Sequence, residues 1–407
     1  MALDRVLAEA YGRWECMKDA TLQHTDVLQI QQAKNWGKTM TTTEVAILGG
    51  GLAGLNAARL LHRAGIDFQL LEARDRLGGR ILTVDETGGH GEDGFDLGPS
   101  WFWPRMQPEL AALVADLQIS AFSQHTAGDV LFERTAQERP YRTGGTGQQQ
   151  ASMRLVGGVG SLIRAIARDL PQGDIHMQAQ VTELLLADGG VTVRIVRAGG
   201  VEDHLTAQYV ISTLPPRLMA EAIRLVPHPA PAIIEGWRKT PTWMSPHAKF
   251  FAIYNRPFWR EDGLSGTANS LVGPLAEIHD ATTYSNKAAL FGFVGIPAAQ
   301  RAVLGPDVLQ QAATEQLVRL FGPQAMTPRA TLLKDWATAR FTATAADAGD
   351  PSHPSAAGSP EFRGEWTGRL ALSGSETSHT EPGYLAGAVE ASRKTVEAWI
   401  EMRARYV

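Results

Sequence analysis

The feature that most constrains the fold of this chain is a glycine-rich turn between a short apolar run and a helical pattern. Residues 45–48 are all apolar, which is typical of a buried parallel strand. A helical pattern over 55–64 and a second apolar run at 68–71 follow the turn. Together they predict a βαβ unit of roughly 30 residues, and with it an α/β fold.

The turn itself has the spacing of a dinucleotide-binding fingerprint. Gly49 permits a tight turn, Gly51 lets the backbone approach a pyrophosphate, and Gly54 allows the helix to pack closely on the strand. The N-terminus of the following helix faces the anion. Glu72 ends the second apolar run, where a carboxylate accepts hydrogen bonds from a ribose 2′-hydroxyl. The alternative is a glycine-rich turn that binds nothing, which the strand–helix–strand context makes the weaker interpretation.

Composition excludes several other classes of protein. The 407 residues carry a formal net charge of −5, whereas a broad nucleic-acid surface needs a basic excess. Cys16 is the single cysteine, so an intrachain disulfide, a zinc knuckle and an iron–sulfur cluster are excluded. The histidines are scattered singly, and we expect no metal site. Without a long apolar run or a secretory signal, a cytoplasmic location with no membrane span is expected.

Residues 1–39 differ from the rest because they are polar and poor in glycine. Apolar side chains recur there at helical spacing, which predicts a short amphipathic helix. We interpret the segment as an appendage, since the sequence from Met40 resembles a natural protein start. A docking helix for a partner or a membrane surface is the alternative.

Periodicity predicts the remaining elements along the chain. The expected helices are 108–117, 161–170, 308–321 and 383–401. The expected strands are 191–195 with a hairpin turn at 198–200, 209–212, 249–254 and 370–374. Two polar, turn-rich segments follow a different pattern: residues 120–151 are expected to be a loop or a domain crossing, and residues 343–364 a loop or lid.

Two further runs carry a family resemblance. Residues 72–80, EARDRLGGR, and residues 96–100, DLGPS, resemble the flavin-dependent amine oxidase family, which includes monoamine, polyamine and L-amino-acid oxidases. The similarity extends from about residue 44 to residue 399. It implies FAD rather than NAD, and a Rossmann-type FAD-binding domain combined with a discontinuous mixed-sheet substrate domain.

The resemblance also implies domain boundaries. The FAD-binding domain would comprise residues 40–118, 157–238 and 339–407. The substrate domain would comprise residues 119–156 and 239–338, and residues 1–39 would form an N-terminal extension.

Individual site residues follow from the same resemblance. Val181 would offer its backbone to adenine, and Glu376 would bind the ribityl or ribose side. The helix that starts near Tyr384 would point its N–H groups at the flavin. The residues assigned to FAD are Gly49, Gly51, Leu52, Ala53, Gly54, Glu72, Ala73, Arg74, Gly79, Arg80, Gly98, Pro99, Ser100, Val181, Trp336, Glu376, Tyr384 and Leu385.

The catalytic residues implied are Lys249 and Tyr384. In the family a strand lysine holds a water at the flavin, and two aromatic side chains form a cage for the substrate. Tyr384 matches one cage residue. The other cage position falls on Ala346. The cysteine that binds flavin covalently in animal monoamine oxidases corresponds to Ala345. Non-covalent FAD is therefore expected, and the missing cage wall falls to one of four aromatic residues: Trp101, Trp103, Trp243 or Phe291. His379 is a further residue expected to approach the site.

The activity implied is oxidation of an amine C–N bond to an imine, with molecular oxygen as the acceptor. The partners are then a small amine and oxygen, and an oligomer is compatible with the sequence. One alternative is a flavin-dependent desaturase or dehydrogenase that uses a non-oxygen acceptor. Another is a flavin-binding protein without turnover.

Overall fold

The computed structural model describes residues 42–145, 152–187, 189–355 and 364–405. The expectations for residues 1–39, including the amphipathic helix, lie outside this part of the chain.

The βαβ unit predicted from the glycine turn is present. Strand β1 (Thr42–Leu48) leads into helix α3 (Leu52–Arg63), and β2 (Phe68–Leu71) returns parallel to β1. Leu55, Ala58 and Leu61 are fully buried, so one stripe of α3 packs against the sheet. The chain therefore leaves the end of β1 through a tight turn that leads directly into a helix.

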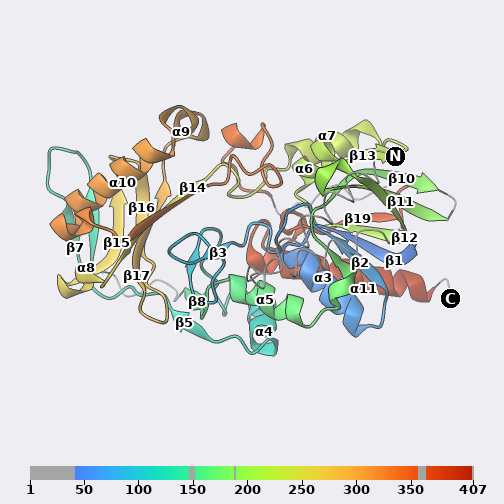
Figure 1. Cartoon of the computed structure of the whole chain (residues 1–407), viewed down its shortest axis with the longest axis horizontal. Coiled ribbons are helices and arrows are strands. Elements are labelled where there is room, and N and C mark those ends of the chain that lie inside the picture. Colours follow the sequence, from blue (N-terminus) through green and yellow to red (C-terminus); the bar gives the residue numbers. More distant parts are fainter. Residues whose placement is uncertain (1–41, 146–151, 188, 356–363, 406–407) are drawn as a thin grey trace, which may run out of the picture. The chain divides into compact units, whose positions relative to one another are not determined.

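This unit belongs to an eight-stranded mixed sheet. Its order is β13-β10-β11-β12-β1-β2-β9, and β19 also pairs with β12. The bounds are β9 Ile175–His176, β10 Ala179–Ala187, β11 Gly190–Arg197, β12 Glu202–Ser212, β13 Arg224–Val226 and β19 Leu370–Leu372. The predicted hairpin is confirmed, because β11 and β12 are antiparallel across residues 198–200. Figure 1 shows α3, α5 (Gly160–Arg168) and α11 (Leu385–Ala404) beside these strands.

A second, seven-stranded sheet has the order β18-β14-β17-β16-β15-β6-β7. Helix α10 (Pro306–Phe321) packs against two of its strands (Figure 1). The bounds are β6 Asp129–Glu133, β7 Tyr141–Thr143, β14 Ala248–Tyr254, β15 Leu264–Ser270, β16 Leu275–Asp280, β17 Ala288–Val294 and β18 Ala330–Asp335.

Alternation along β14 gives its two faces different neighbours. Phe250, Ala252 and Tyr254 join the core that contains α10. Phe251 and Ile253 join a separate apolar cluster with residues 84, 95 and 97, which precede the second sheet in the chain. Because side chains alternate with a period of two, Lys249 shares the face of Phe251. The Lys249 side chain therefore points to the same side of the sheet as the apolar cluster that contains residues 84, 95 and 97.

The expectation of a loop over 120–151 was wrong for the described residues. Strands β5 (Ala121–Ser123), β6 and β7 lie within this segment. β6 pairs in parallel with β15, more than 130 residues later, and β7 forms the sheet edge. Such pairing depends on distant partners, so a local polar pattern concealed it. In the other loop expected, 343–364, the described residues contain one 3-10 turn, η4 (Asp347–Gly349).

The remaining elements are short, apart from α4 and α7. Of the predicted helices, α4, α5, α10 and α11 are confirmed within a few residues. The other bounds are β3 Thr83–Val84, β4 Phe95–Asp96, α4 Pro108–Asp116, β8 Met153–Leu155, η1 Gln172–Asp174, η2 Ala198–Gly200, α6 Pro216–Ala222, α7 Pro231–Lys239, α8 Phe258–Glu261, α9 Ala298–Leu304, η3 Pro323–Met326 and η5 Ser375–Thr377. No helix in the described ranges combines the length and apolar character that crossing a bilayer requires.

Candidate active site

A cavity of about 500 Å³ extends from the glycine turn after β1 to strand β14 of the second sheet. Most of the predicted site residues line it. They are Gly49, Gly51, Leu52, Ala53, Glu72, Arg74, Gly79, Arg80, Gly98, Pro99, Ser100, Lys249, Trp336, Tyr384 and Leu385. Four predicted residues are not among the lining residues: Gly54, Ala73, Val181 and Glu376.

The glycine turn at one end has a geometry that larger residues would not permit. Gly49 has a φ of 101°, in the region that favours glycine. A Cβ on Gly54 would lie 1.9 Å from the carbonyl oxygen of Gly49. A Cβ on Gly51 would instead meet nothing closer than the Gly78 carbonyl oxygen at 4.0 Å. The turn is therefore closed on the side of α3, and Gly51 leaves open space beside the cavity.

Glu72 is held in place by backbone donors. Its two carboxylate oxygens accept hydrogen bonds from the backbone N–H of Gly50 at 2.7 Å and of Arg74 at 2.8 Å. The side chain is nearly fully buried, yet the residue lines the cavity. A carboxylate oxygen has further lone pairs, so Glu72 retains acceptor capacity toward a ligand.

Glu376 acts on the cavity through a second residue. Its carboxylate is bound in bidentate fashion by Arg80, with N–O distances of 2.5 and 2.9 Å. Arg80 also donates to the carbonyl oxygen of Trp243 at 3.1 Å and to Ser375 Oγ at 2.9 Å. The pair ties the loop after β2 to the segment before α11, and Arg80 rather than Glu376 reaches the cavity.

Lys249 lies at the opposite end, on β14. Its Nζ donates to the carbonyl oxygen of Gly98 at 2.6 Å, to Ser100 Oγ at 2.9 Å and to the carbonyl oxygen of Asp96 at 3.3 Å. Burial lowers the pKa of Lys249 to about 7, although the Asp96 carboxylate acts to raise it. The amine therefore exchanges its proton near neutral pH.

Aromatic rings surround this amine. Nζ lies 4.6 Å from the ring centroid of Phe291 and 5.1 Å from that of Phe293. Trp101 contacts both phenylalanines, with centroid distances of 5.4 and 6.4 Å. The rings attract a cation at these distances, which offsets only part of the effect of burial on Lys249.

Tyr384 has an aromatic neighbour in Trp243. Their ring centroids are 6.2 Å apart, and both residues line the cavity. His353 packs edge-on against Trp243 at 4.3 Å. Of the four aromatic candidates for the missing cage wall, Trp101, Trp103 and Trp243 line the cavity, whereas Phe291 does not. Trp243 is the one with a ring contact to Tyr384.

The expectation that His379 approaches the site was wrong, because this residue is exposed and is not among the cavity-lining residues. Ala345 and Ala346 are likewise exposed and outside the cavity lining. The histidine that does line the cavity is His247, just before β14. Burial lowers the pKa of His247, so its neutral form is favoured.

Several lining residues were not found from the sequence. Thr213 and Leu214 directly follow β12, which runs parallel to β1, and the carboxyl ends of such strands are the expected ligand-binding edge. The position of Thr213 and Leu214 at this edge could therefore have identified them from the sequence. The others depend on register or on loop packing and gave no local signal: Gln107, Met244, Glu277, Phe293, Phe341 and Thr342.

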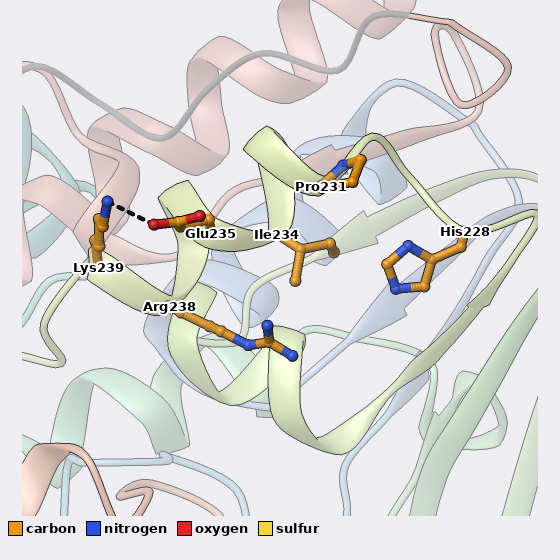
Figure 2. Close-up of a pocket in the computed structure, with 6 residues that line it drawn as sticks. All are labelled: His228, Pro231, Ile234, Glu235, Arg238 and Lys239. Atoms are coloured by element: carbon orange, nitrogen blue, oxygen red, sulfur yellow. Dashed lines mark ion pairs between the residues drawn. The ribbon is translucent and has the colours of Figure 1, made fainter.

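A second hollow, of about 400 Å³, lies on α7 and the preceding residues. Figure 2 shows the ion pair of Glu235 and Lys239, 2.7 Å apart, at one end of it and His228 at the other. None of the predicted site residues lines this hollow. Within the described chain, no group of three or more His, Cys, Asp or Glu side chains is placed to hold a metal ion. The first cavity is therefore the candidate active site.

Comparison with known proteins shows the family of the chain. The family model of flavin containing amine oxidoreductases matches residues 52–143 and 120–400. A probable flavin-containing monoamine oxidase A of Dictyostelium discoideum is 24% identical, over 86% of this chain and 96% of the relative. Putrescine oxidase of Kocuria rosea is 23% identical, over 75% of this chain and 84% of the relative.

Solved structures share the fold. A putrescine oxidase bound to putrescine superimposes with a TM-score of 0.75 at 21% identity, covering 89% of this chain and 100% of the other. Cyclohexylamine oxidase from Brevibacterium oxydans gives a TM-score of 0.72 at 19% identity, covering 89% of this chain and 99% of the other. The chain therefore belongs to the family of flavin-containing amine oxidoreductases and is an enzyme of that family.

Proposed function

We propose that the protein oxidises the C–N bond of a small amine to an imine, with non-covalently bound FAD and with molecular oxygen as the electron acceptor. The observation that carries the proposal is the single cavity that joins the glycine turn to Lys249 and Tyr384. It brings a nucleotide-type site and a buried amine of perturbed pKa into one cavity.

The residues present fit FAD in two ways. First, α3 begins at the cavity with Gly51 as N-cap, no acidic residue in its first turn, and open space beside Gly51. This arrangement favours a pyrophosphate at the helix N-terminus. Second, α11 begins at the cavity directly after Tyr384, again with no acidic residue in its first turn. Its N-terminus favours negative charge at the flavin end.

In this proposal, Glu72 accepts from the ribose of the adenosine half. The glycine turn with Leu52 and Ala53 holds the pyrophosphate. Arg80, oriented by Glu376, lies on the path between the two ends of the cofactor. The backbones of Ala73 and Val181 are assigned to the adenine end. Val181 stands at an irregularity of β10, where the pairing with β11 shifts between Val181 and Glu183.

The proposed domains follow the two sheets. Residues 40–118, 157–238 and 339–407 would form the FAD-binding domain, and they supply the strands of the eight-stranded sheet. Residues 119–156 and 239–338 would form the substrate domain, and they supply the strands of the seven-stranded sheet.

Bound FAD supplies the two-electron acceptor for the C–H bond next to the amine nitrogen. The chain's own residues bind and orient the amine: Tyr384 and Trp243 form the aromatic wall, and Phe293 and Trp101 exclude water from the second-sheet side. Lys249 holds a proton at the reacting end, where its Nζ donates to Gly98, Ser100 and Asp96. An amine that binds in its neutral form needs no strong general base, and water hydrolyses the imine afterwards.

We propose non-covalent attachment on the basis of the cysteine positions. Cys16 is the single cysteine of the chain, and the position that resemblance assigns to flavin attachment is Ala345.

The test uses the purified protein. Its visible spectrum should show an oxidised flavin, and a panel of amines should bleach that spectrum under argon. Admission of oxygen should restore the spectrum and release one hydrogen peroxide per amine oxidised. Bleaching without peroxide release would favour an enzyme with another electron acceptor. A flavin spectrum that no amine bleaches would refute the proposal.

A further inference from the structure

Asp96 is a buried carboxylate with no role in the amine oxidation proposed above. It is on β4, is 2% exposed, and pairs with Thr83 on β3. Its Oδ1 accepts hydrogen bonds from Thr83 Oγ1 at 2.5 Å and from the backbone N–H of Val159 at 2.9 Å. Because Val159 is the N-cap residue of α5, this oxygen is bound at the start of that helix.

The second carboxylate oxygen of Asp96 has no such function. Oδ2 is buried and has no hydrogen-bond partner among the described residues. A buried carboxylate oxygen without a donor is costly unless another group balances its charge. An asparagine would accept the same two hydrogen bonds through its side-chain carbonyl oxygen. The contacts at the start of α5 therefore do not explain why a carboxylate is present.

The Lys249 amine lies next to Asp96 on the cavity side. Its Nζ donates to the backbone carbonyl oxygen of Asp96 at 3.3 Å, and the three hydrogen bonds that it donates all go to uncharged oxygens. Burial lowers the pKa of Lys249 to about 7, and the Asp96 carboxylate acts against burial. Asp96 thus balances the charge of Lys249 through space.

Arg154 is a second buried cation with uncharged partners. It is on β8, is 5% exposed, and donates to the carbonyl oxygens of Thr282 at 2.8 Å and Ala281 at 3.3 Å. Burial lowers the pKa of Arg154, and Asp96 is the carboxylate that opposes this most. Arg154 in turn lowers the pKa of Lys249. One buried anion therefore interacts with two buried cations.

Other titratable side chains lie on the elements packed beside Lys249. They are Lys334 on β18, Glu277 and His279 on β16, and His247 directly before β14. They are not among the groups that shift the pKa of Lys249, which are Asp96 and Arg154. The protonation of Lys249 is therefore governed by burial, one buried anion and one buried cation.

We infer that Asp96 is a positioning residue for Lys249: its carboxylate is the counter-charge that keeps this amine cationic at the reacting end, and Arg154 weakens the effect by sharing the same carboxylate. The inference rests on the proposed function, in which Lys249 holds a proton, and it assigns the groups that set this charge.

The direct test is an NMR titration of the flavin-loaded enzyme labelled with carbon-13 at the lysine Cε. The Lys249 signal is identified by its loss in Lys249→Met, and its wild-type midpoint should lie at a pH of about 7. Asp96→Asn keeps the acceptor at the start of α5 and removes the charge, so the midpoint should fall by about 1–2 pH units. Arg154→Gln removes the second cation and keeps a donor for one carbonyl oxygen, so the midpoint should rise by about 0.5–1 pH unit.

A control variant separates this coupling from a general loss of stability. Glu133→Gln removes a buried carboxylate that is paired with Arg319, on a strand four positions from β14 in the same sheet. It should leave the Lys249 midpoint unchanged even where it lowers the melting temperature. Shifts of opposite sign in the two test variants cannot come from destabilisation alone. If Asp96→Asn does not fold, Arg154→Gln still decides, because the inference requires its midpoint to rise.

A second readout follows the oxygen reaction without any amine. The enzyme is reduced with one equivalent of dithionite and mixed with oxygenated buffer, and the pH at which reoxidation slows should move with the NMR midpoint of each variant. A wild-type midpoint in Asp96→Asn or in Arg154→Gln would overturn the inference. Midpoints that shift while reoxidation does not follow them would uphold the coupling of Asp96 to Lys249 and refute the part of Lys249 in the proposed oxygen reaction.

Discussion

Replacing Lys249 by methionine should slow the reaction of the enzyme with oxygen. Methionine keeps a similar length and apolar volume but removes the charge and the three hydrogen bonds that Nζ donates. A unit charge about 5 Å from the reacting atoms, at an effective dielectric constant of about 20, contributes roughly 3 kcal/mol. A loss of about 2–4 kcal/mol corresponds to roughly 30- to 1,000-fold in rate.

The assay is stopped-flow spectroscopy of each half-reaction. Enzyme reduced by amine under argon is mixed with oxygenated buffer, and the return of the flavin absorbance is timed. Flavin content should stay near wild type, because the glycine turn and Glu72 are at the other end of the cavity. Lys287→Met, at a half-exposed lysine paired with Asp93, is the control and should reoxidise normally.

The pH dependence gives a second readout with a definite sign. Because the pKa of Lys249 is about 7, its cationic fraction falls as the pH rises through 7, and the oxygen reaction should slow over that range. Reduction by amine should have the opposite trend, since the neutral amine becomes more abundant. The methionine variant should lack the decline in the oxygen reaction. If its reoxidation rate and pH profile match wild type, Lys249 has no part in the oxygen reaction.

The same pKa shift predicts how stability changes with pH. The unfolded chain holds this proton up to a pH of about 10.4, whereas the folded chain loses it near 7. Between these values the unfolded state binds more protons, so the contribution of Lys249 to the free energy of unfolding rises with pH. Thermal melts of wild type and Lys249→Met should therefore diverge in favour of wild type as the pH increases. A pH-independent difference would contradict the buried, readily deprotonated lysine.

Three further tests concern the cofactor end of the cavity. Glu72→Gln should lower flavin occupancy, because a charge-assisted acceptor worth about 1.5–3 kcal/mol is lost; equal occupancy after dialysis would refute the ribose assignment. Gly54→Ala should abolish flavin binding or folding, since its Cβ would lie 1.9 Å from the Gly49 carbonyl oxygen. Gly173→Ala is the matched control because no atom lies within 4 Å of its Cβ, and both are compared by circular dichroism and flavin fluorescence. Acid precipitation should leave all flavin in the supernatant, and colour retained in the pellet would show a covalent link.

Local sequence located the nucleotide end of the cavity, and the family resemblance was needed for the end at Lys249. The turn from Gly49 to Gly54 has a spacing that the βαβ backbone requires, so its position could be predicted without tertiary information. Lys249 is on a strand whose alternation decides which way it points, and the family resemblance supplied its role. Both predictions depend on residues that are close in the sequence.

The middle of the cavity was less predictable because it depends on register. Glu277 shares a face of the second sheet with Lys249, because Glu277 pairs with Phe293 and Phe293 pairs with Lys249. A shift of one residue in either antiparallel pairing would turn the Glu277 side chain to the other face. Trp243 and Tyr384 are in contact although some 140 residues separate them in the sequence. Arg80 connects their two segments, because it donates to the carbonyl oxygen of Trp243 and to the carboxylate of Glu376. No periodicity within one element contains such information.

The charges around the nucleotide end indicate what holds a pyrophosphate there. Arg80 is matched by Glu376 at 2.5 Å, and Arg74 stands 3.6 Å from Glu72, so these two cations are already opposed by two anions. Burial also lowers the pKa of Arg74, which means that its charge is costly in this environment. The arginines therefore contribute less attraction than their number suggests. The N–H of Gly50 in the glycine turn is already bound by the Glu72 carboxylate, but the first turn of α3 contains no acidic residue. The N–H groups at the start of α3 are therefore expected to supply most of the affinity for the phosphates. It follows that flavin binding is expected to be more sensitive to the backbone shape of residues 49–54 than to the loss of either arginine charge.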